Sequence, residues 1–196
     1  MADYFSAMPD SILCDGESCK INTDFRVWLK IGKLCRELKK PSVLAACLKE
    51  AYPVLPSSPA AAIRGMLWFL SCGSADTADS RSRENGGKDD GSMPQKAVYD
   101  AEEDSEYIWS AFMRQYGIDL SCAALHWWKF RALLGGLDRD CLFSEIVAYR
   151  SMNTAEIADK ELRRHYERLK KLYALPDRRT DEEREEELAR CFENAF

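Results

Sequence analysis

The sequence predicts an all-α, mainly helical protein with a small β-hairpin near its N-terminus. Apolar side chains recur at spacings of three and four residues in six or seven segments, which is the pattern of amphipathic helices. One pair of short strand-like runs, 11–14 and 18–21, flanks Asp15-Gly16, a dipeptide that readily takes the positive φ angles of a tight turn. The 196-residue chain is 46% hydrophobic and 31% charged, which is typical of a folded globular protein.

Three helices are predicted between the hairpin and residue 73. The first is capped by Asn22 or Thr23, and its apolar stripe is Trp28, Ile31, Cys35 and Leu38. The second spans about 41–51 and the third about 59–72. Each of these two begins at a proline, a residue that suits the first turn of a helix.

Four more helices are predicted at about 101–116, 121–134, 138–149 and 154–173. The helix at 121–134 is apolar on several faces, because Trp127 and Phe130 lie on one flank and Trp128 on another, so we expect it at the centre of a core. The helix at 154–173 carries a narrow stripe made of Leu162, Tyr166, Leu169 and Tyr173. This stripe is the predicted partner-binding surface, and packing within the same chain is the alternative.

Two segments look different from the rest. Residues 74–97 are rich in Ser, Asp and Gly and are predicted to be a flexible linker between an N-terminal part, 1–73, and a helical domain, 98–176. Residues 177–196 are predicted to form an acidic C-terminal helix, which starts at Thr180 with a capping-box pattern.

The charge of the chain argues against nucleic acid as a partner. The net charge is −5, and residues 98–196 alone carry 15 basic and 21 acidic side chains. The most apolar stretch, 60–72, contains Arg64 and is too short to span a membrane, and the N-terminus lacks the features of a signal peptide. We therefore expect a soluble, intracellular protein with no membrane partner.

The sequence favours no enzyme class. None of the eight cysteines forms a C-x-x-C pair, so we expect reduced, buried thiols and no zinc site. Asp100, Asp104 and His126 could in principle serve a small metal-dependent enzyme. The helix dipole accounts equally well for acidic residues at a helix start, and His126 beside two tryptophans is typical of a hydrogen-bonded core group. The prediction is therefore no catalytic residue, no metal and no cofactor.

One string of residues resembles a known family. The motif residues are Phe25 near the start, then Asp100, Asp104 and Phe112, and then the run His126-Trp127-Trp128-Lys129-Phe130, followed by Arg150. Together they closely resemble the bacteriophage gene-product-fifteen family, over roughly residues 9–175. Tryptophan is a rare residue, so the His-Trp-Trp-x-Phe core is a specific signal.

The resemblance implies a role in building the tails of siphophages and prophages. Genes of this family usually lie just ahead of the gene for the tape measure protein, a position that resembles that of tail assembly chaperones. The resemblance therefore implies a chaperone in the host bacterial cytoplasm. Its expected partner is the tape measure protein, with other tail proteins as further candidates. A minor structural or connector component of the tail is the alternative, and self-association into a homo-oligomer stays open.

Overall fold

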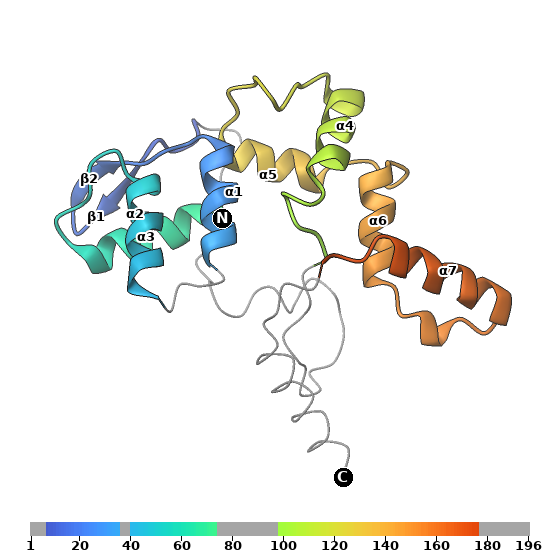
Figure 1. The fold of residues 1–196 in the computed structure, drawn as a ribbon. Coiled ribbons are helices and arrows are strands. Elements are labelled where there is room, and N and C mark those ends of the chain that lie inside the picture. The colour runs from blue at the N-terminus through green and yellow to red at the C-terminus, as the bar shows by residue number, and fades with distance from the viewer. Residues whose placement is uncertain (1–6, 36–39, 74–97, 177–196) are drawn as a thin grey trace, which may run out of the picture.

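The computed structural model describes residues 7–35, 40–73 and 98–176. In these residues a two-stranded sheet is followed by seven α-helices and one short 3-10 helix, which confirms the predicted fold class. The elements are β1 (Ser11–Cys14), β2 (Glu17–Lys20), α1 (Phe25–Leu34), α2 (Pro41–Ala51), α3 (Pro59–Leu70), α4 (Ser105–Tyr116), α5 (Trp127–Gly135), α6 (Leu142–Ser151), η3 (Thr154–Glu156) and α7 (Lys160–Leu172). Figure 1 shows the hairpin and α7 at opposite ends of the fold, with α5 between them.

The hairpin forms at the predicted turn. Asp15 and Gly16 have φ angles of 51° and 88°, the left-handed pair that a tight hairpin turn requires. The strands pair antiparallel with Ser11 opposite Lys20, so the inward face of β1 presents Ile12 to α3. There α3 has Gly65, where an added Cβ would lie 2.1 Å from the Cδ1 atom of Ile12. The absent side chain lets helix and strand approach closely.

The first helix is capped by a different residue from the one predicted. Asp24, rather than Asn22 or Thr23, is the N-cap of α1, and its carboxylate accepts the backbone N–H of Arg26. The Asn22 side chain accepts the N–H of Asp24 and so supports the turn before the helix. The predicted position Leu38 lies outside the described residues.

Three helices of the second half, α4, α5 and α6, begin later than the predicted starts at about 101, 121 and 138. For α4 and α5, side chains fold the preceding residues into turns. Before α4, the Asp100 carboxylate accepts the backbone N–H groups of Glu102 and Glu103. Before α5, the Asp119 carboxylate accepts the N–H and hydroxyl of Ser121 and the indole N–H of Trp109. These bonds favour the ionised carboxylate and lower the pKa of Asp119 to about 2.

The predicted helix at 154–173 is interrupted. Asn153 caps the short η3, and the chain then extends through Ile157 before Asp159 caps α7 by accepting the N–H groups of Glu161 and Leu162. Two separate caps therefore divide a segment whose apolar spacing looks continuous in the sequence.

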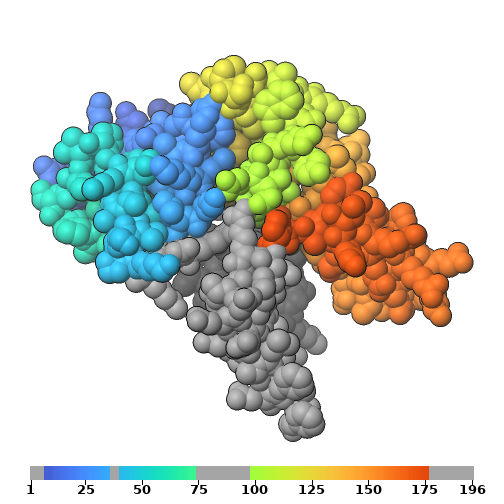
Figure 2. Space-filling model, viewed as in Figure 1, coloured from blue at the N-terminus to red at the C-terminus, as the bar shows by residue number. Residues whose placement is uncertain are grey.

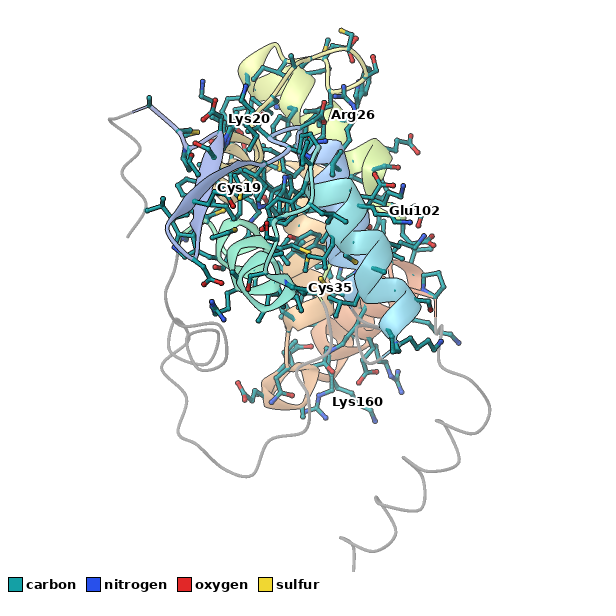
Figure 3. All side chains as sticks on the ribbon, turned by 90° about the vertical axis from the view of Figure 1, so that its left-hand side faces the viewer. Cys19, Lys20, Arg26, Cys35, Glu102 and Lys160 are labelled. Atoms are coloured by element: carbon teal, nitrogen blue, oxygen red, sulfur yellow. The ribbon has the colours of Figure 1, made fainter. Side chains whose placement is uncertain are left out.

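Segments 23–25 and 125–127 pair across about 100 residues of sequence. The Phe25 N–H donates to the Leu125 carbonyl at 3.1 Å, and the Trp127 N–H donates to the Thr23 carbonyl at 2.8 Å. This bridge joins the chain immediately before α1 to the chain immediately before α5. Farther along α1, Lys33 forms an ion pair with Glu102, which is labelled in Figure 3.

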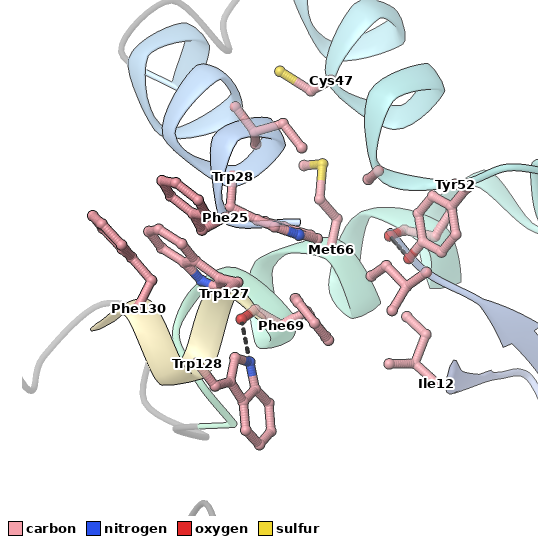
Figure 4. Close-up of a cluster of buried hydrophobic side chains, with 14 of the residues drawn as sticks. Ile12, Phe25, Trp28, Cys47, Tyr52, Met66, Phe69, Trp127, Trp128 and Phe130 are labelled. Atoms are coloured by element: carbon pink, nitrogen blue, oxygen red, sulfur yellow. Dashed lines mark hydrogen bonds between the residues drawn. The ribbon is translucent and has the colours of Figure 1, made fainter. Parts of the chain in front are cut away.

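The hydrophobic core takes side chains from both sides of residues 74–97. Phe25 of α1 stacks on Phe130 of α5 with ring centroids 4.7 Å apart, and Phe130 stacks on Phe112 of α4 at 5.3 Å. Trp28 contacts Phe69 of α3 at 4.7 Å, as Figure 4 shows. The predicted parts 1–73 and 98–176 thus share one core, while 74–97 and 177–196 lie outside the described residues.

Each buried tryptophan donates its indole N–H to a backbone carbonyl. Trp28 donates to the carbonyl of Asn22 at 2.7 Å. Trp127 and Trp128 donate to the carbonyls of Leu70 and Phe69 at 3.1 and 3.0 Å. The last two acceptors are at the C-terminal end of α3, where carbonyls lack the amide donor that they would have in the helix interior. The Phe69 carbonyl also accepts the backbone N–H of Cys72 at 3.1 Å. The aromatic pair therefore fills the core and also caps α3.

Trp128→Ala tests this double role. Removing a buried tryptophan typically costs about 3–5 kcal/mol of unfolding free energy, and here the Phe69 carbonyl also loses one of its donors. Trp109, which is 42% exposed, offers the matched control, and Trp109→Ala should cost about 1 kcal/mol or less. Urea denaturation monitored by circular dichroism measures the unfolding free energy of both variants. Equal losses in the two variants would contradict the assignment.

Candidate partner-binding site

The helix α7 carries the predicted partner-binding stripe and lies at one edge of the molecule (Figures 1 and 2). None of its residues is buried. Its termini are stabilised locally, since Asp159 and Glu161 lie at the positive end of the helix dipole and Lys170 and Lys171 at the negative end. The helix thus depends on caps and surface contacts more than on burial.

The predicted stripe divides between two roles. Tyr166 and Tyr173 pack on Tyr149 of α6, with ring centroids 6.2 and 6.1 Å apart, and Tyr173 also contacts Tyr107 of α4. Leu169 is half-buried, whereas Leu162 is 47% exposed. The tyrosines therefore hold α7 to its own chain, and Leu162 is the member of the stripe most open to a partner.

A buried ion pair anchors the end of α7. The guanidinium of Arg150, at the end of α6, donates to both carboxylate oxygens of Asp104, at 2.6 and 2.8 Å. The two side chains are only 10% and 1% exposed. Arg150 also donates to the carbonyl of Tyr173 at 2.5 Å and to that of Val98 at 3.3 Å. One side chain therefore links the start of α4, the end of α6 and the residue that follows α7.

Arg150 is the residue whose role sequence reasoning missed. It belongs to the string that resembles the phage family, but its partner lies 46 residues away, and no local spacing points to it. A buried carboxylate such as Asp104 needs a compensating cation. The only signal in the sequence for this ion pair was an arginine, Arg150, at the end of a predicted helix.

The three residues of the metal-site alternative do not come together. The Asp104 carboxylate accepts from Arg150 and from the Asp100 N–H at 3.0 Å, while the Asp100 side chain closes the turn before α4. His126 bonds to the chain before β1 instead. Within residues 7–35, 40–73 and 98–176, no group of three His, Cys, Asp or Glu side chains could hold a metal ion.

His126 caps α5 as a neutral imidazole. Its Nδ1 atom accepts the backbone N–H of Trp128 at 3.1 Å, and Nε2 lies 3.0 Å from the Pro9 carbonyl, which can only accept. The proton therefore resides on Nε2. Burial disfavours a second proton and lowers the pKa of His126. His126 is thus a hydrogen-bonded core residue, as expected, and it also caps α5.

The motif residues Phe25, Phe112, Trp127, Trp128 and Phe130 all lie in the shared core. A comparison with known protein families matches residues 5–175 to the family described as bacteriophage Gp15 protein. The chain belongs to this family. No curated protein and no solved structure gives a significant match. The Gp15 match runs past the end of α7 and stops before residues 177–196.

None of the described helices of this Gp15 family member is both long enough and apolar enough to cross a bilayer.

Arg150→Met should be strongly destabilising. It leaves the buried Asp104 carboxylate without its cation, a change that typically costs about 3–5 kcal/mol. Arg64→Met removes an arginine from the exposed pair with Asp15, and it should cost less than about 1 kcal/mol. Guanidinium denaturation compares the two variants. A loss for Arg150→Met no larger than that for Arg64→Met would contradict the anchor.

Acidification should weaken the fold through His126. Because its folded-state pKa lies below the ordinary value of 6.5, the stabilisation is complete above pH 6.5 and is lost as the pH falls toward the folded-state pKa. His126→Asn keeps an acceptor for the Trp128 N–H and cannot titrate. Unfolding free energies measured from pH 8 to pH 5 should fall more steeply for the native chain. Parallel curves would show that His126 contributes nothing to the pH dependence.

Proposed function

We propose that this Gp15 family member acts in phage tail morphogenesis as a chaperone that binds the tape measure protein. Membership of the family supports a phage role, and the resemblance described above supports the tail, through the usual position of the family's genes ahead of the tape measure gene. The observation that carries the binding role is α7, an amphipathic helix with no buried residue at one edge of the core.

The chemistry of α7 suits a helical client. Leu162 is 47% and Leu172 is 71% exposed, on a helix whose other exposed residues are charged apart from His165. A surface of this kind can cover an apolar stripe of another helix while its charged residues keep the complex hydrated. The tyrosines that face α6 leave these two leucines for the client.

A non-catalytic role is part of the proposal. Asp100, Asp104 and His126, the residues of the enzyme alternative, each make structural hydrogen bonds that hold a turn, an ion pair or a helix cap. These bonds account for the three side chains without a substrate, a metal or a cofactor.

Co-expression with the tape measure protein of the same phage tests the proposal. The tape measure should sediment when expressed alone and stay in the supernatant with the native chain. Leu162→Glu/Leu172→Glu should abolish this effect, because it places charges where apolar contact is needed. Leu13→Glu, at a 77% exposed leucine of the hairpin, is the matched control and should retain it. A tape measure that sediments equally with and without the native chain would refute the chaperone role.

Mass spectrometry of purified particles separates chaperone from tail component. A chaperone should be absent from mature virions while still binding the tape measure in infected cells. A fixed stoichiometry in the virion would instead identify a structural or connector component of the tail.

A further inference from the structure

Three cations on the outward face of α7 have no partner among the described residues. Arg164, Arg168 and Lys171 are exposed. Within residues 7–35, 40–73 and 98–176, no ion pair or side-chain hydrogen bond involves any of the three. Glu161 and Glu167 belong to the same helix, yet in these ranges neither pairs with a cation.

Two other cations of α7 hold the helix to its own chain. Arg163 donates to the carbonyl of Ile157 at 2.6 and 2.9 Å. Lys170 donates to the carbonyl of Met152 at 2.7 Å. Both side chains are half-buried, in contrast to the three outward cations. The inward basic residues of α7 therefore have a structural use within the described chain, and the outward ones have none.

The outward residues form a row with a defined spacing. Arg164, Arg168 and Leu172 are four residues apart, so their side chains follow one ridge along the helix surface. Leu172 is 71% exposed and ends this row. A second helix packed along the row would meet one apolar side chain and then two guanidinium groups, one on each successive turn.

The charge of the rest of the chain favours a short acidic segment over a nucleic acid. Helix α7 has six basic and two acidic residues, a net charge of +4. The whole chain has a net charge of −5, so the residues outside α7 carry −9 in total. Duplex DNA has one phosphate charge per about 1.7 Å and would continue past the roughly 20 Å of α7, where it would meet this negative charge. A single protein helix places its charges along α7 alone.

We propose that the outward face of α7 binds a partner helix with two acidic residues four positions apart and a large apolar residue four positions beyond them. The carboxylates pair with Arg164 and Arg168, since a guanidinium group matches the geometry of a carboxylate. The apolar residue contacts Leu172. Only the identification of this partner helix with a segment of the tape measure protein rests on the proposed function.

Fluorescence anisotropy with a designed helical peptide tests the site on the full chain at low ionic strength. The labelled probe carries one Leu and two Glu at four-residue spacing, and a matched peptide has Lys in place of both Glu. The native chain should bind the acidic peptide and not the basic one. Added salt should weaken the binding, because it screens the exposed charges.

Arg164→Gln/Arg168→Gln should weaken binding of the acidic peptide about tenfold, because both ion pairs are lost. Lys129→Gln/Arg139→Gln lowers the net charge equally at exposed residues outside α7 and should leave the binding unchanged. Arg164→Glu/Arg168→Glu should reverse the preference, so that the basic peptide binds and the acidic one does not.

The proposal would be overturned if the native chain bound neither peptide or bound both equally. Binding that survives Arg164→Gln/Arg168→Gln would also overturn it. A short DNA duplex that binds the native chain as tightly as the acidic peptide would assign the cations to nucleic acid instead.

Co-expression with the tape measure separates this proposal from the chaperone role. A tape measure kept soluble by the native chain and released by Arg164→Gln/Arg168→Gln would support both. Equal solubility with the native chain and with this variant would support the chaperone role and overturn the acidic site on the client. A tape measure that sediments with the native chain, while the acidic peptide still binds, would refute the chaperone role and support the site for another acidic helix.

Discussion

The rest of the fold depends on the contact between the start of α5 and the end of α3. Three consecutive side chains, His126, Trp127 and Trp128, satisfy the ends of two helices at once. The imidazole accepts the N–H of Trp128 at the beginning of α5, and the two indoles donate to carbonyls at the end of α3. Unsatisfied groups at buried helix ends are costly, so these bonds fix the angle at which the two helices meet while the same rings fill the core.

A second joint extends the fold from that core to α7. Phe112 of α4 stacks on Phe130, and Asp104, the residue before α4, holds Arg150 at the end of α6. Through Arg150 and the tyrosines around Tyr149, the position of α7 follows from that of α4. The outermost helix is thus connected to the aromatic core by one ion pair and one group of rings. That arrangement keeps α7 in place without burying any of its residues.

Periodicity predicted the elements whose burial is strong, and it failed where a side chain overrides it. The hairpin follows from the Asp-Gly turn, α2 from the proline at its start, and the central place of α5 from apolar residues on several of its faces. The late starts of α4 and α5 depend on bonds made by Asp100 and Asp119, whose geometry leaves no period in the sequence. For the candidate site, the apolar stripe on α7 could be predicted from the sequence. Which of its residues pack on Tyr149 and which face solvent could not be predicted, because that depends on contacts between helices.

The bridge between residues 23–25 and 125–127 has a consequence for synthesis on the ribosome. The aromatic side chains Trp28 and Phe69 emerge long before their partners Trp127 and Trp128, so the N-terminal helices must wait with an open apolar face until α5 has been made. At about 5–20 residues per second, the roughly 100 residues between Trp28 and Trp127 take about 5–20 seconds to synthesise. The length of the intervening chain matters little to the final stability, because doubling a loop costs only about 0.6 kcal/mol. Insertions there would therefore lengthen the exposed interval far more than they would weaken the finished protein.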